Sequence, residues 1–99
     1  MSDFFKHLPA IQGKLEIYHY LINENQEKIA VIGDPEGLRS LSEMIRFLAD
    51  WDQDLSGIPI GEREHIHIRP GTELGKRSCE VEICRADAKG TGKYPAFME

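Results

Sequence analysis

The sequence predicts an α+β fold: a two-layer ββαββ sandwich in which one helix packs on one face of a mainly antiparallel four-stranded sheet. Four short segments alternate apolar and polar residues, as half-buried strands do. One longer segment repeats its apolar residues with helical spacing and lies between the second and third strand segments. The 99 residues have the length of a single domain. Within 1–99 we expect a folded core over residues 14–85, an arm over 1–13 and a flexible tail over 86–99.

The first two strand segments, residues 14–22 and 28–32, are separated by a polar run. The first segment alternates and contains tyrosines and isoleucines, and the second is a β-branched run that ends at Gly33. Two such segments on either side of a short polar turn predict an antiparallel hairpin.

The helix is predicted from Asp34 to about Trp51. The Asp34 side chain is suited to accept hydrogen bonds from the free backbone N–H groups of the first turn, and Pro35 lacks an N–H where none is needed. Apolar residues then recur at helical spacing at Leu38, Leu41, Ile45 and Leu48. We expect this stripe to pack against the sheet.

The last two strands are predicted over residues 64–69 and 78–85, which alternate again after a predicted loop at 52–63. The apolar face that we expect beneath the helix consists of Ile66, Ile68, Val81 and Ile83.

The net charge of −5 is concentrated in one part of the chain. Residues 34–64 hold eight acids against three arginines, so this segment accounts for the net charge of the whole chain. Because a nucleic-acid-binding protein needs a basic face, nucleic acid is not an expected partner. A concentrated acidic surface speeds encounter with a basic partner, and solubility alone is the other explanation for it. The sequence has no apolar run long enough for a membrane span and no secretory signal, which favours a cytoplasmic protein.

Two aromatic residues of the predicted helix, Phe47 and Trp51, lie four residues apart on the side away from the apolar stripe. Exposed aromatic side chains with a charged rim are typical of protein-binding patches. The predicted partner-binding residues are Phe47, Trp51, Asp50, Asp52, Asp54, Glu62 and Glu64. Two alternatives stay open: the arm or the tail covers the two aromatic rings, or the same face forms a homodimer contact.

A second candidate site lies on the other face of the last two strands. His65 and His67 alternate on one strand and Glu80 and Glu82 on the next, so the four side chains share an open face if the strands pair. Imidazoles and carboxylates are common zinc ligands, whereas a solvated cross-strand cluster is the ordinary explanation of such a pattern.

The sequence contains neither a nucleophilic serine motif nor a phosphate-binding loop. No serine lies in a Gly-x-Ser-x-Gly turn, and residues 33–37 lack the lysine of a phosphate loop. Cys79 and Cys84 lie too far apart along one strand to form a disulfide, so two reduced thiols are expected. We therefore expect no enzymatic activity and no cofactor.

Several short motifs resemble those of one small bacterial family. They are the helix start GDPEGL at residues 33–38, the leucine-rich helix that ends in Leu-Ala, the HIHI strand at 65–68 and a final strand bearing glutamate. Over roughly residues 15–85 the chain is similar to the immunity protein 32 family of bacterial polymorphic toxin systems. The resemblance implies a cytoplasmic α+β protein that neutralises a cognate toxin by binding it, and it supplies no catalytic residues.

The resemblance and the charge together favour an immunity protein that occludes its toxin through an acidic surface containing aromatic residues. A nuclease is one class of toxin with a basic cleft that such a surface fits. The alternative function is a small metal- or ligand-binding protein that uses the open sheet face around His65 and His67.

Overall fold

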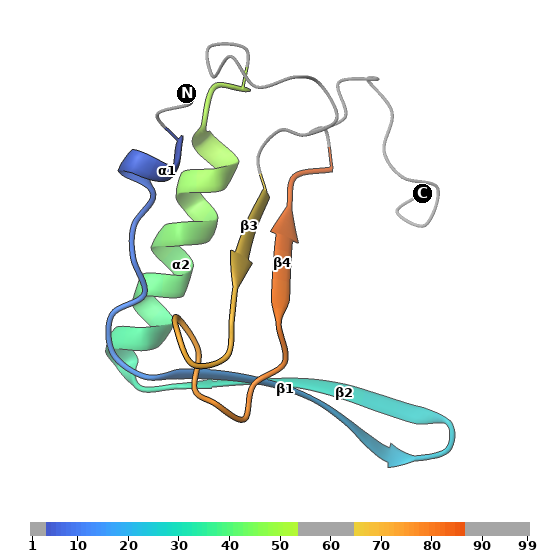
Figure 1. The fold of residues 1–99 in the computed structure, drawn as a ribbon. Helices are drawn as coiled ribbons and strands as arrows, with labels where there is room; N and C mark the ends of the chain where they lie inside the picture. The colour runs from blue at the N-terminus through green and yellow to red at the C-terminus, as the bar shows by residue number, and fades with distance from the viewer. Residues whose placement is uncertain (1–3, 54–64, 87–99) are drawn as a thin grey trace.

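The computed structural model describes residues 4–53 and 65–86 of the chain (Figure 1). Its elements are α1 (Phe4–His7), β1 (Leu15–Asn23), β2 (Gln26–Gly33), α2 (Pro35–Asp50), β3 (His65–Ile68) and β4 (Val81–Cys84). The α+β class is therefore confirmed, and each predicted strand and the predicted helix has a counterpart. The predicted loop lies outside the described residues from position 54 onward, and the predicted tail does so from position 87.

The hairpin of β1 and β2 is antiparallel, as predicted, with Leu15 opposite Gly33 and Leu21 opposite Glu27. Figure 1 shows that it runs across the base of β3 and β4 and extends well beyond them. Only its base is covered, because Leu15 and Ile17 are buried whereas residues 19–29 are exposed. The hairpin therefore projects from the body of the protein.

Helix α2 begins as the sequence predicts. The Asp34 Oδ1 atom accepts hydrogen bonds from the backbone N–H of Gly37 at 2.7 Å and of Lys14 at 3.1 Å. The first bond caps the helix, and the second fixes the start of β1 against it. Both bonds stabilise the carboxylate, so they lower the pKa of Asp34 from its ordinary value, with the Gly37 bond as the larger cause.

The buried face of α2 differs from the predicted stripe. Leu48 is buried as expected, but Leu38 and Ile45 are 44% and 43% exposed. The buried residues are Gly37, Ser40, Met44 and Leu48, with Leu41, Phe47 and Trp51 partly buried against the core. The reason is that α2 is covered from two sides, by the strands and by the N-terminal arm, which moves the centre of the buried face toward Met44.

The N-terminal arm, predicted over residues 1–13, packs into the core through its described residues. Phe4 of α1 is fully buried, and its ring centroid lies 5.4 Å from that of Phe47 and 5.5 Å from that of Trp51. Further along the arm, the backbone N–H of Gln12 donates to Ser40 Oγ at 3.1 Å. Figure 1 shows the arm running along the length of α2.

The prediction of a single four-stranded sheet is not confirmed, because β1–β2 and β3–β4 form two separate antiparallel sheets. The chain between β3 and β4 turns at Gly71 and then runs beside β1 as irregular backbone. It joins β1 through the Gly75 N–H, which donates to the Leu15 carbonyl at 2.9 Å, and the Cys79 N–H, which donates to the Ile17 carbonyl at 2.9 Å. The two sheets thus meet through a few hydrogen bonds and a shared core.

Within the described ranges, 4–53 and 65–86, no helix has the length and apolar character that a membrane crossing requires.

Candidate functional site

The outer face of β3 and β4 carries a cluster of side chains that are common metal ligands. Ile66 and Ile68 are buried on the inner face at 1% and 0% exposure, so His65 and His67 point outward. The register places Glu82 opposite His67 and Cys84 opposite His65. Ligand atoms of His65, His67 and Glu82 all lie within 4.8 Å of one another. The two imidazole rings meet edge to face, with centroids 5.2 Å apart.

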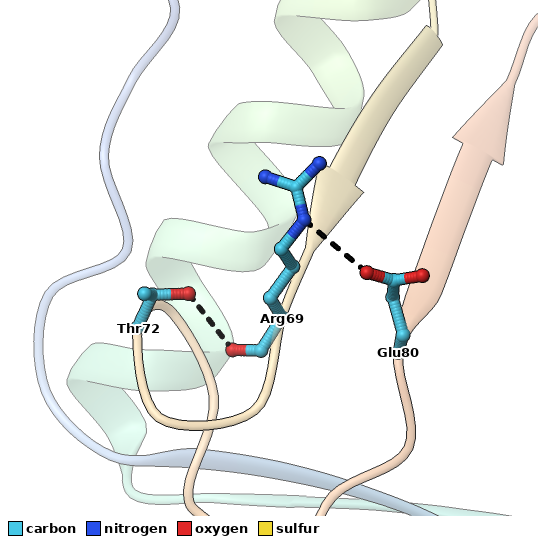
Figure 2. A network of polar contacts seen from close by, with 3 residues as sticks. All are labelled: Arg69, Thr72 and Glu80. Atoms are coloured by element: carbon cyan, nitrogen blue, oxygen red, sulfur yellow. Dashed lines mark hydrogen bonds and ion pairs between the residues drawn. The ribbon is translucent and has the colours of Figure 1, made fainter.

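The fourth predicted ligand, Glu80, is outside this cluster, which corrects the expectation for that residue. Strand β4 begins only at Val81, and the Glu80 carboxylate forms an ion pair with Arg69, with Nε and Oε1 3.2 Å apart (Figure 2). The Thr72 hydroxyl donates to the Arg69 carbonyl at 3.0 Å and so holds the turn in which Arg69 lies. The structure therefore assembles three of the four predicted residues.

Cys84 is a neighbour of the cluster that the sequence interpretation did not include. Its Sγ atom lies 3.1 Å from Glu82 Oε1 and donates a hydrogen bond to it. Burial, this hydrogen bond and the charge of Glu82 raise the pKa of the Cys84 thiol to about 11. The thiol is therefore protonated at neutral pH and is a poor nucleophile. Cys79 and Cys84 are both free, so the prediction that they do not pair is confirmed.

The predicted outward pair, Phe47 and Trp51, turns inward. Both residues are partly buried against the core, and their ring centroids lie 5.5 Å apart beneath Phe4. In the structure, Phe4 of the arm covers the two rings, which is one of the alternatives that the sequence left open. The pair therefore presents only its remaining exposed edges to a partner.

The predicted acidic residues at the end of α2 are exposed. Asp50 forms an ion pair with Arg46 at 3.8 Å on the helix surface, and Asp52 lies just beyond the helix. The other predicted members, Asp54, Glu62 and Glu64, lie outside the described residues. The structure thus brings two of the five predicted carboxylates to one place, the carboxyl end of α2.

A third region, which sequence analysis missed, is apolar. Leu21, Ile29 and Val31 are exposed by 62%, 69% and 47%, and the register places them on the hairpin face that continues the buried residues Leu15 and Ile17. We call these three residues the hairpin patch. The sequence did contain a sign of this patch, because both faces of the hairpin carry apolar residues. A hairpin that buries one face needs apolar residues on that face only.

These features define a small α+β protein with its candidate sites on the surface. The model of a family described as Immunity protein 32 matches residues 28–86, more than half of the chain. The chain therefore belongs to the immunity protein 32 family, and the resemblance inferred from its motifs is confirmed. The match begins within β2, so the arm and β1 lie outside it. No curated protein and no solved structure matches the chain.

Proposed function

We propose that this chain is an immunity protein that neutralises a cognate bacterial toxin by binding it in the cytoplasm, not by catalysis. Membership of the immunity protein 32 family is the observation that supports this function most strongly. Occlusion of a toxin requires a surface that binds tightly, and the described residues offer two regions of different chemistry.

The hairpin patch is the region that we propose makes the main contact. Soluble monomers rarely expose a contiguous group of large apolar side chains, and such groups commonly mark interaction sites. Ile29 is 69% exposed, with Val31 next to it on the same face of β2 and Leu21 diagonally across on β1. His19, opposite Ile29, and Glu27, opposite Leu21, form an ion pair at 3.7 Å on this face and so make up its polar part. Ile29 and Val31 also lie within the matched segment of the family. The partner surface would therefore be apolar at its centre.

The carboxyl end of α2 is the second region, and we propose that it guides the toxin electrostatically. Asp50 and Asp52 are exposed there, and residues 34–53 hold five acids against two arginines. The edges of Phe47 and Trp51 contribute apolar area beside these carboxylates. Such charges act mainly on the association rate. Because they are negative, they speed the encounter with a toxin that has a basic surface, and nucleases are one class of such toxins.

Isothermal titration calorimetry with a candidate cognate toxin, sought among the proteins encoded next to this one, tests the proposal. We expect the double variant Ile29→Thr/Val31→Thr to bind roughly 100-fold more weakly, because each substitution removes about 1–1.5 kcal/mol of apolar contact. Ile32→Thr is the matched control, since Ile32 is 55% exposed on the opposite face of β2. Equal affinity for the double variant and the wild type would refute the assignment of the main contact to the hairpin patch.

Charge reversal at Asp50 and Asp52 tests the second region separately. We expect slower association and a weaker dependence of the rate on salt, with little change in the dissociation rate. If the dissociation rate changes instead, these carboxylates lie in the centre of the interface and not at its edge.

A further inference from the structure

We propose that the outer face of β3 and β4 binds a zinc ion through the imidazoles of His65 and His67 and the carboxylate of Glu82. This site is separate from the proposed toxin-binding function and does not depend on it.

The backbone already places the three side chains on one side of the sheet. His65 and His67 are two residues apart on β3, and Glu82 lies directly opposite His67 on β4. Beneath them, Ile66 and Ile68 are almost fully buried, which holds the strand in place. A metal ion would therefore meet ligands on a fixed support.

The distances are close to those that zinc requires. Zinc bonds of about 2.0–2.1 Å hold tetrahedral ligand atoms about 3.3 Å apart. The ligand atoms of His65, His67 and Glu82 lie within 4.8 Å of one another. We expect side-chain rotations, with no change in the backbone, to bring these atoms to the shorter spacing when zinc binds.

No other group of the described residues hydrogen-bonds to the two imidazoles, which make only the edge-to-face contact with each other. The Glu82 carboxylate accepts one hydrogen bond, from the Cys84 thiol to Oε1 at 3.1 Å. Glu80, the nearby carboxylate in the same sequence pattern, is engaged by Arg69. The two imidazoles are therefore free to bind an ion, and Glu82 would exchange only a weak thiol hydrogen bond for it.

The donor set selects the class of ion. Two imidazole nitrogens and one carboxylate oxygen suit zinc and similar transition metals, whereas magnesium and calcium prefer oxygen ligands alone. Two histidines and one glutamate form a known three-residue zinc arrangement that leaves one position for water. We therefore expect zinc to bind and magnesium not to bind.

Calorimetric titration of the full chain with zinc chloride is the test. The protein prepared for this titration should carry no polyhistidine tag and should have the substitutions Cys79→Ser and Cys84→Ser, so that neither a tag nor a thiol contributes ligands. We expect one zinc ion per chain and a zinc-dependent rise in Tm that magnesium chloride does not produce. His65→Asn, His67→Asn and Glu82→Gln should each weaken zinc binding by roughly 100-fold or more. Loss of a residue that only holds a ligand in place costs up to about 100-fold, and these three are the ligands themselves.

Two matched variants separate this site from nonspecific binding. Glu80→Gln removes the carboxylate held by Arg69, and His19→Asn removes an exposed histidine of the hairpin that pairs with Glu27. Both should bind zinc as the parent chain does, and circular dichroism should show the same fold in all variants. Absence of zinc binding in the parent, or equal losses in the control and ligand variants, overturns the proposal.

Discussion

Replacement of Phe4 by alanine should destabilise the whole domain, although Phe4 lies near the N-terminus. Its side chain is fully buried, and its ring packs against those of Phe47 and Trp51 at centroid distances of 5.4 and 5.5 Å. Removal of a buried phenylalanine side chain typically costs about 3–5 kcal/mol. A domain of this size has a total stability of about 5–15 kcal/mol, so Phe4→Ala should remove a large part of it.

Thermal unfolding of the full chain, followed by circular dichroism, measures this effect. A loss of about 3 kcal/mol lowers Tm by at least about 12 °C in a domain of this length. Phe5→Ala is the matched control, because the neighbouring Phe5 is 62% exposed and its removal should cost little. Equal changes in Tm for Phe4→Ala and Phe5→Ala would show that the arm is not part of the core.

Three further substitutions test individual contacts. The pKa of Asp34 is lower in the folded state than in the unfolded state, so the ionised carboxylate stabilises the fold at pH values above the unfolded pKa of about 3.9. This stabilisation is lost as the pH falls through the folded-state pKa. Wild type and Asp34→Asn should therefore differ in Tm near neutral pH and converge in acid. Gly37→Ala should lower Tm despite the helix preference for alanine, because a Cβ would lie 2.0 Å from the Lys14 carbonyl oxygen. Ser78→Ala should cost about 1–3 kcal/mol in urea unfolding, because the buried N–H of Ile17 loses its acceptor.

Controls for these substitutions come from the exposed side of α2. Ser42→Ala and Glu43→Gln alter exposed residues, and both should change stability by less than about 0.5 kcal/mol. If Gly37→Ala and Ser78→Ala are as stable as these controls, the backbone at Lys14 and the edge of β1 are held by other contacts than those in the structure. If Asp34→Asn and wild type show parallel pH profiles, the Asp34 carboxylate does not have a lowered pKa.

The local elements were predictable because each depends on residues close in sequence. Alternation indicated which segments form strands, and the Asp34–Pro35 pair marked the first turn of α2, where the structure places the cap. The arm was less predictable. Its role depends on the contact of Phe4 with Phe47 and Trp51, more than forty positions away, and no local pattern specifies such a contact.

The division into two sheets was also outside the reach of sequence patterns. Alternation shows which residues share a face of a strand, but it does not show which strands pair across a long connection. The link between the sheets uses the backbone of Gly75 and Cys79 and the hydroxyl of Ser78, none of which has a periodic signal.

The metal-ligand cluster was predicted in outline, since a His-x-His strand places both rings on one face. The choice between Glu80 and Glu82 depended on the register and on where β4 begins, which sequence alone did not give. The choice among the alternatives for Phe47 and Trp51 was beyond the sequence for a related reason. The predicted helix face assumed cover from the sheet alone, and the arm changed which side of α2 is buried.

The proposed function is tested most directly by the growth of bacteria that express a candidate cognate toxin, sought among the proteins encoded next to this one, with and without this chain. The proposed function predicts that the wild-type chain restores growth and that Ile29→Thr/Val31→Thr, expressed at the same soluble level, does not. Continued growth arrest in the presence of the folded wild-type chain contradicts the proposal that it neutralises this toxin.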